Sequence, residues 1–303
     1  MLEPSPHRSG FACLVGRPNA GKSTLTNALV GQKVAITSSR PQTTRHTIRG
    51  ILHRPDAQLV LVDTPGLHRP RTLLGQRLND LVHETLAEVD VVALCIPADE
   101  KVGPGDRFIA EALAAAPRST KLAFVTKTDK ASRQQIAEQL LAVTAMGDQL
   151  LGGFADVVPA SAVSGEQVDV VAEVLLKHLP EGPRLYPDGE LTDEPEQVMI
   201  AELVREAALE GVRDELPHSL AVVVEEMTKP DDGPLRVHVW IYVERDSQKG
   251  IVIGRGGARL KDVGIRSRRG IEKLLGTKVH LDLRVKVAKD WQRDPKQLQR
   301  LGF

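Results

Sequence analysis

The octapeptide GRPNAGKS at residues 16–23 constrains the fold of this chain more than any other segment. It matches the pattern G-x-x-x-x-G-K-S, whose glycines let backbone N–H groups wrap a phosphate while the lysine contacts the outer phosphates. An apolar run at residues 11–16 precedes it and a helix-like stretch at residues 22–30 follows, which is the strand-loop-helix context that such a loop needs. We therefore predict a nucleotide-phosphate site whose contact residues are Gly16, Arg17, Pro18, Asn19, Ala20, Gly21, Lys22 and Ser23.

Further short apolar runs indicate the fold around this loop. They lie at residues 57–62, 91–96, 122–125 and 157–159, with helix-like stretches between several of them. This alternation predicts an α/β fold with a largely parallel sheet covered by helices. Because ligands of such sheets bind beyond the carboxyl ends of the strands, the loops that follow these runs should meet at one site.

Three of those loops carry residues suited to a guanine nucleotide. In the first, the Asp63 carboxylate can hold Mg²⁺ and the Gly66 N–H can sense the γ-phosphate. In the second, Asp129 can accept hydrogen bonds from N1 and the exocyclic amino group of guanine, donors that adenine does not offer in that arrangement. In the third, residues 161–162, a backbone N–H can meet the guanine O6. Each motif is weak alone, but their order predicts GTP contacts from Asp63, Thr64, Pro65, Gly66, Leu67, Thr126, Lys127, Thr128, Asp129, Ser161 and Ala162.

The polar stretch SSRPQTTR at residues 38–45 is the place to seek a further magnesium ligand. Such a stretch can form a mobile loop whose threonine joins Mg²⁺ when GTP is bound. We favour Thr44 over Thr43, which gives Ser23, Thr44 and Asp63 as the predicted metal ligands. The nine histidines show no metal-ligand spacing and offer no competing site.

Charge is unevenly distributed along the 303 residues. The formal net charge is zero, yet residues 248–303 hold 15 Lys or Arg against 5 Asp or Glu. The length suits two domains, and a Pro, Gly and acid-rich stretch at residues 181–197 is the expected linker. The only cysteines, Cys13 and Cys95, lie in apolar runs, which favours packing roles in a reducing cytoplasm, and no apolar run approaches the length of a membrane span.

The basic part contains a second glycine loop, GRGG at residues 254–257, followed by a basic helix-like stretch. A G-x-x-G turn of this kind clamps the backbone of about four nucleotides in one class of RNA-binding module. The excess of cations would add a salt-dependent attraction to phosphates. We predict RNA contacts, with no DNA expected, from Gly254, Arg255, Gly256, Gly257, Arg259 and Lys261. The alternative is a basic domain that docks to a membrane surface or a protein partner.

Six segments together give a resemblance over nearly the whole chain. GRPNAGKST, SSRPQTTRH, DTPGLH, TKTD and SAVSG look like the guanine-nucleotide motifs of the Era family of bacterial GTPases, and IVIGRGG with the basic helix that follows looks like its C-terminal KH domain. The resemblance implies a Ras-like P-loop G domain at residues 8–180, the linker, and an α+β type II KH domain at residues 198–303. It also implies binding near the 3′ end of 16S ribosomal RNA, a role in 30S subunit assembly, and a cytoplasmic location with occasional peripheral contact with the membrane.

Two positions depart from the usual GTPase pattern. Thr126 stands where the guanine motif normally begins with Asn, and its hydroxyl can still tie this loop to the phosphate loop. Leu67 stands where GTPases of the Ras kind place a glutamine that orients water, so we expect slow intrinsic hydrolysis. Catalysis is then expected to depend on Lys22, Asn19 and Gly66 with Mg²⁺, and Asn19 is also a candidate for holding K⁺ against the phosphates.

Overall fold

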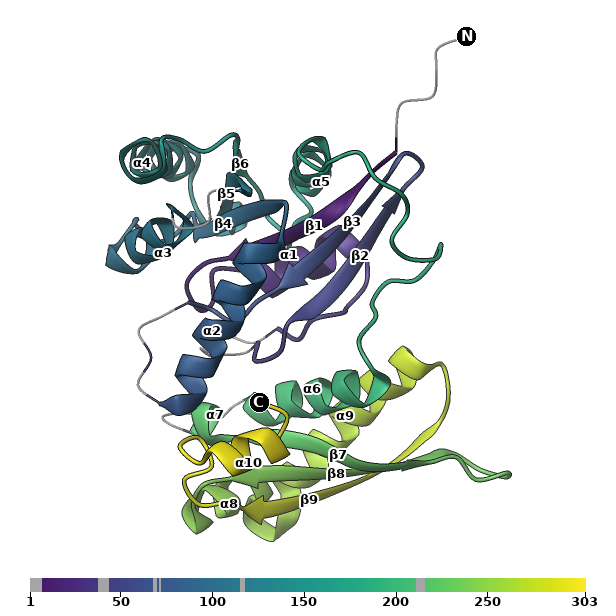
Figure 1. Cartoon of the computed structure of the whole chain (residues 1–303). Coiled ribbons are helices and arrows are strands. Elements are labelled where there is room, and N and C mark those ends of the chain that lie inside the picture. Colours follow the sequence, from purple (N-terminus) through teal and green to yellow (C-terminus); the bar gives the residue numbers. More distant parts are fainter. Residues whose placement is uncertain (1–6, 38–43, 68–69, 71, 115–117, 211–215) are drawn as a thin grey trace. The chain divides into compact units, whose positions relative to one another are not determined.

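The structure is a computed structural model that describes residues 7–37, 44–67, 70, 72–114, 118–210 and 216–303 (Figure 1). The described chain forms two compact units, one mainly before and one mainly after residue 193. Within the described residues, no helix has both the length and the apolar character needed to cross a bilayer.

The first unit is an α/β domain. Its sheet has the strand order β2-β3-β1-β4-β5-β6, in which only the edge pair β2 and β3 is antiparallel. Its elements are β1 (Arg8–Val15), α1 (Lys22–Val30), β2 (Ile48–Arg54), β3 (Ala57–Asp63), α2 (Leu73–Glu88), β4 (Val91–Pro97), α3 (Pro104–Ala114), β5 (Thr120–Thr126), η1 (Thr128–Lys130), α4 (Arg133–Leu151), β6 (Val157–Pro159) and α5 (Val168–Lys177). The sequence prediction of a largely parallel sheet is confirmed, although β2 had no clear apolar run and was not foreseen.

The central strands are continuous apolar runs because helices cover both faces of the sheet. In β1, Ala12 and Leu14 join the core beneath α1 and α5, while Cys13 and Val15 join the core beneath α2, α3 and α4. Cys95 of β4 is buried in the first of these cores. Burial raises the pKa of both thiols to about 12, so both cysteines act as small packing residues.

Residues 181–193 are hydrogen-bonded to this sheet, first to β1 and β3 and then to the edge strand β2. The N–H of Ile51 in β2 donates to the carbonyl of Leu191 at 2.9 Å. The Gln58 side chain both accepts from the N–H of Tyr186 and donates to its carbonyl, at 2.9 Å each. The stretch predicted as part of a linker is therefore held on the first unit as far as Asp193.

The second unit has a three-stranded sheet of order β7-β8-β9, antiparallel between β7 and β8 and parallel between β8 and β9. Helices α6, α8 and α9 share one core with the inward side chains of this sheet. The elements are α6 (Glu196–Leu209), α7 (Leu216–Ser219), β7 (Ala221–Thr228), β8 (Leu235–Val243), α8 (Asp246–Ile253), η2 (Arg255–Gly257), α9 (Ala258–Leu275), β9 (Val279–Val287) and α10 (Pro295–Arg300). The glycine loop lies between α8 and α9; the sequence predicted the basic helix that follows it, but not α8 before it.

Candidate nucleotide site and glycine-loop groove

The phosphate loop connects β1 to α1. A Cβ added to Gly16 would come within 2.6 Å of the Cys95 carbonyl oxygen, so only glycine fits there. Asn19 and Gly21 have left-handed backbones, with φ of 64° and 90°. The Lys22 ammonium donates to the carbonyls of Gly16 and Arg17 at 3.1 Å each, and its burial lowers the pKa of Lys22. The loop therefore holds a dehydrated cation at the place where the pattern requires a phosphate contact.

The three predicted metal ligands lie together. The hydroxyl of Ser23, at the start of α1, donates to Oδ2 of Asp63 at 2.7 Å, and the Thr44 hydroxyl donates to the same oxygen at 3.2 Å. The two hydroxyl oxygens are 3.0 Å apart. One carboxylate and two hydroxyls are hard oxygen donors that suit Mg²⁺ bound with water and nucleotide phosphates. Thr43, the alternative to Thr44, lies outside the described residues.

The loop after β3 lies directly against the phosphate loop. A Cβ on Gly66 would lie 2.8 Å from the backbone nitrogen of Pro18, which leaves no room for a side chain. Thr64 donates to the carbonyl of Leu14 at 3.0 Å and so fastens this loop to β1. Leu67 is 2% exposed and packs in the core beneath α2, where it cannot orient water.

The predicted guanine loop, residues 126–129, is hydrogen-bonded to the phosphate loop through its first residue. The Thr126 hydroxyl donates to the carbonyl of Ala20 at 2.7 Å. Asp129 accepts a 2.6 Å hydrogen bond from the Ser161 hydroxyl, which brings the two predicted base-binding loops together. Thr128 donates to Glu166 at 3.1 Å, a contact that the sequence did not reveal. The sequence-predicted nucleotide residues thus converge from four loops at the carboxyl ends of the strands.

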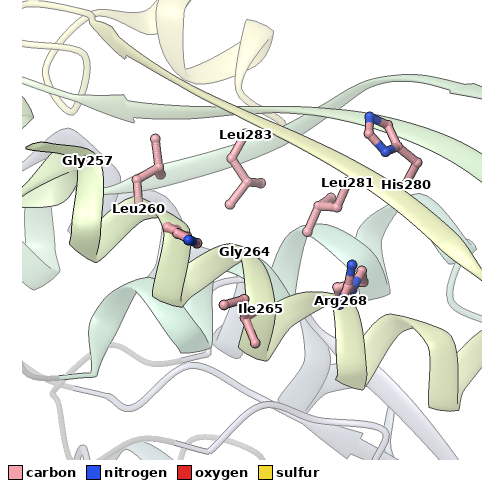
Figure 2. Close-up of a pocket in the computed structure, with 9 residues that line it drawn as sticks. Gly257, Leu260, Gly264, Ile265, Arg268, His280, Leu281 and Leu283 are labelled. Atoms are coloured by element: carbon pink, nitrogen blue, oxygen red, sulfur yellow. The ribbon is translucent and has the colours of Figure 1, made fainter.

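The glycine loop of the second unit borders a groove of about 380 Å³ (Figure 2). Gly254 must be glycine, because its φ is 75° and a Cβ would lie 2.7 Å from Cβ of Arg259. The groove runs between α9 and the edge strand β9, and its floor is apolar with cationic side chains along the helix. Its lining consists of Gly257, Leu260, Lys261, Gly264, Ile265, Arg268, His280, Leu281 and Leu283.

Two arginines of α9 face α6 rather than this groove. The Arg259 guanidinium donates to the carbonyls of Ala208 and Glu210, at 3.2 and 2.7 Å, where α6 ends. Arg266 pairs with the carboxylates of Glu210 and Asp262. The RNA contact of Arg259 stays a prediction, and in this structure its guanidinium is bound to the end of α6.

The groove also contains residues that the sequence reasoning missed. Gly264, Ile265 and Arg268 follow Lys261 at three, four and seven positions, so they share one face of α9. That periodicity was the signal that could have found them. His280 comes from β9 and could be assigned to the groove only once the strand was paired.

Comparisons with known proteins agree with both units. The family model described as a 50S ribosome-binding GTPase matches residues 11–127, and the KH-domain model matches residues 215–292. GTPase Era of Streptomyces coelicolor is 68% identical over 302 residues, covering 98% of this chain and 95% of that protein. The chain belongs to the Era family of GTPases. GTPase Era of Mycolicibacterium smegmatis is 69% identical over 299 residues, covering 98% and 99% of the two chains.

Solved Era structures share the fold over almost the whole length. A crystal structure of Era with MgGDPNP and nucleotides 1506-1542 of 16S ribosomal RNA has a TM-score of 0.92 and 35% identity, covering 98% of this chain and 99% of that one. A single-residue variant of Aquifex aeolicus Era bound to GDP.AlF4- also has a TM-score of 0.92, at 34% identity, covering 97% and 99%. The first unit is therefore a G domain that hydrolyses GTP, and the second is a KH domain.

Proposed function

We propose that this chain is a slow GTP-hydrolysing switch that binds 16S ribosomal RNA near its 3′ end and acts in 30S subunit assembly. The observation that carries the proposal is the groove beside the glycine loop, which occurs in the same chain as the converging loops of the predicted guanine-nucleotide site. The solved Era relative with a bound segment of 16S ribosomal RNA supports the choice of RNA. In this proposal residues 8–180 are the G domain, 181–197 the linker and 198–303 the KH domain.

The groove suits single-stranded RNA. The glycine loop has no side chains at Gly256 and Gly257 to keep a backbone away, and added Cβ atoms there would meet nothing within 4 Å. Exposed Arg255, Lys261 and Arg268 can attract phosphates, while half-exposed apolar side chains can pack against unstacked bases. The predicted contacts of Gly254 to Gly257 and Lys261 are retained in this proposal.

In this proposal the residues of the nucleotide site support hydrolysis but leave it slow. Mg²⁺, when held by Ser23, Thr44 and Asp63, would neutralise phosphate charge. Lys22 would move from its two carbonyl acceptors to the outer phosphates, and the Gly66 N–H would meet the γ-phosphate. The Leu67 side chain cannot polarise water, so the chain depends on other charge, for which K⁺ beside Asn19 is our candidate.

Fluorescence anisotropy with a short RNA from the 3′ end of small-subunit ribosomal RNA tests the proposal. The protein is loaded with a non-hydrolysable GTP analogue or with GDP, and we expect tighter binding with the analogue. The variant Arg255→Asp plus Gly256→Asp should lose RNA binding while it keeps the GTPase rate, because both positions lie in the KH domain.

Vesicles that contain anionic lipid provide the second arm of this test. They address the peripheral membrane contact, which would place some of this cytoplasmic protein at the inner face of the cell membrane. Loss of vesicle binding in the same variant, with no specific RNA binding by the parent protein, would favour a membrane-docking domain and overturn the RNA proposal.

A further inference from the structure

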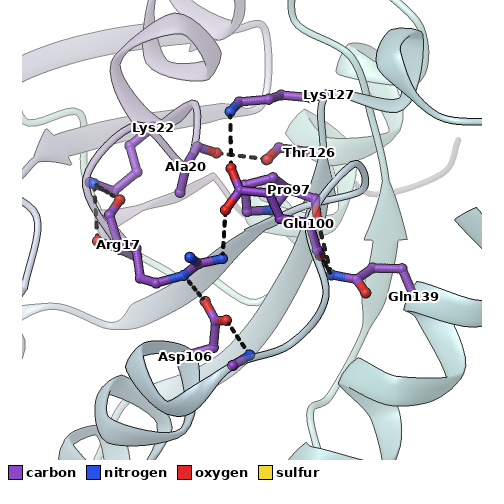
Figure 3. Close-up of polar contacts among 11 residues, drawn as sticks. Arg17, Ala20, Lys22, Pro97, Glu100, Asp106, Thr126, Lys127 and Gln139 are labelled. Atoms are coloured by element: carbon purple, nitrogen blue, oxygen red, sulfur yellow. Dashed lines mark hydrogen bonds and ion pairs between the residues drawn. The ribbon is translucent and has the colours of Figure 1, made fainter. Parts of the chain in front are cut away.

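A charged network borders the nucleotide site on the side of α3 (Figure 3). Arg17 belongs to the phosphate loop, Glu100 to the loop between β4 and α3, Asp106 to the first turn of α3, and Lys127 to the guanine loop. Neither carboxylate belongs to a recognised nucleotide motif. All four residues are in the G domain, so the network does not depend on the KH domain.

Arg17 is anchored through a fully buried carboxylate. Its Nε donates to Oδ1 of Asp106 at 2.7 Å, and Asp106 is 0% exposed. The other oxygen of Asp106 accepts from the N–H of Gly103 at 2.8 Å, which fixes the carboxylate at the start of α3. The Arg17 stem lies against Gly105, where a Cβ would come within 2.7 Å of its Cδ. Arg17 is therefore held both by its charge and by its packing.

Glu100 connects the two loops that a guanine nucleotide must contact. One of its oxygens is 3.1 Å from a terminal nitrogen of Arg17, and the other is 4.0 Å from the Lys127 ammonium. The backbone beneath it is also fixed, because buried Gln139 of α4 donates to the carbonyls of Pro97 and Glu100, at 2.9 and 2.7 Å. A single carboxylate on a rigid loop thus faces both the phosphate loop and the guanine loop.

This geometry separates two possible roles for an arginine in a phosphate loop. An arginine that stabilised the transferring phosphate would need its guanidinium on the nucleotide side of the loop. Here the guanidinium is bound by two carboxylates on the side of α3. An exposed ion pair would contribute little to the stability of the loops. Here the Asp106 carboxylate is buried and Glu100 pairs with two cations, so the network contributes more than an exposed pair would.

We propose that Arg17 is a positioning residue that, with Asp106 and Glu100, holds the phosphate loop and Lys127 in their binding geometry before the nucleotide arrives. The network then raises nucleotide affinity by preorganisation, since fewer loop conformations are lost on binding. It acts mainly on nucleotide release, because the charges of Arg17, Asp106 and Glu100 are paired with one another on the side of α3. The inference deepens the proposed nucleotide site and does not involve RNA.

The test is the dissociation rate of fluorescent GDP, measured by displacement with excess unlabelled nucleotide. Arg17→Met keeps the length of the stem and Asp106→Asn keeps the shape of the carboxylate, and each should speed release about tenfold. The double variant should be no faster than the faster single variant, because both remove the same contact. In Asp106→Asn, the conversion of preloaded GTP in a single turnover should change less than about twofold, which separates positioning from catalysis.

Arg107→Met is the matched control. Arg107 follows Asp106 in α3, and its guanidinium donates to Gln149 on the exposed surface, outside the network. The Arg107→Met variant should release GDP at the rate of the parent protein. The Glu100 side chain is half-exposed, so Glu100→Gln should not disturb folding. This variant should speed GDP release about threefold.

The outcomes distinguish this inference from the proposed function. If the parent protein bound no guanine nucleotide, the proposed function itself would fail. If the parent bound it normally and the Arg17, Asp106 and Glu100 variants released it at the parental rate, the positioning role would be wrong. Slower hydrolysis with unchanged release would instead make Arg17 a catalytic residue and also overturn the inference.

Discussion

Thr126→Val is the substitution whose effect can be worked out most directly from the structure. Valine has nearly the shape of threonine, so the packing of this 4% exposed side chain is kept while its hydroxyl is lost. The loss removes the 2.7 Å hydrogen bond to the carbonyl of Ala20, which is also buried. A buried acceptor left without its donor costs about 1–3 kcal/mol. Because this bond ties the guanine loop to the phosphate loop, we expect part of that cost to appear as weaker nucleotide binding.

The expected loss of GDP affinity is about 5- to 30-fold, equivalent to about 1–2 kcal/mol. Isothermal titration calorimetry on nucleotide-free protein measures it, with Thr85→Val as the control. Thr85 is a buried threonine of α2 whose hydroxyl donates within its own helix, to the carbonyl of Leu81, so its variant should bind GDP normally. Thr126→Asn restores the usual residue of the motif and should bind at least as well as the parent. Unchanged GDP affinity in Thr126→Val would refute the idea that this bond couples the two loops.

Three further predictions concern separate parts of the G domain. Gly66→Ala should weaken binding of a GTP analogue about tenfold more than binding of GDP, since the added Cβ would push the γ-phosphate-sensing loop off Pro18; equal losses would contradict it. If Asn19 holds K⁺, hydrolysis should slow several-fold when K⁺ is replaced by Na⁺, and equal rates in the two buffers would exclude the ion. His178 donates to Asp156 at 2.7 Å, and this hydrogen bond lowers the pKa of the Asp156 carboxyl. The stabilisation of the folded protein by this pair is therefore complete above the ordinary carboxyl range and is lost as pH falls through the lowered pKa. Asp156→Asn should therefore flatten the acid limb of a stability profile measured by urea unfolding, and an unchanged limb would contradict this.

The parts of the site that the sequence predicted are those set by short motifs. The glycines of residues 16–23 allow the backbone conformation of the phosphate loop, and the apolar runs form the strands whose ends carry the other loops. The contacts that hold these loops together could not be predicted in the same way. Glu100, Asp106 and Gln139 occupy no motif, and their roles depend on how far α3 and α4 lie from the phosphate loop. Pairing of distant elements, rather than local pattern, decides such contacts.

The second domain shows the same limit for charge. The count of cations in residues 248–303 pointed to a region that lies largely within the KH domain, but it could not tell on which side of α9 each cation lies. Arg259 and Arg266, seven positions apart, face α6 and its terminal carbonyls or carboxylates. Lys261 and Arg268, also seven apart, line the groove. Helical periodicity therefore divides the basic helix into a structural face and a face available to phosphates.

This division predicts the salt dependence of RNA binding. Three exposed cations, Arg255, Lys261 and Arg268, lie at the glycine loop or in the groove. Each phosphate contact on a single strand contributes about −0.7 to the slope of log affinity against log salt, so the groove predicts a slope of about −2. If all 15 cations of residues 248–303 made such contacts, the slope would be about −10.

Anisotropy titrations between low and physiological salt measure this slope. Arg268→Gln should reduce it by about 0.7 while Arg266→Gln leaves it unchanged, because only the first of these arginines lines the groove. A parental slope steeper than about −5 would mean that RNA covers far more of the domain than the groove, and the assignment of the two faces would then be wrong.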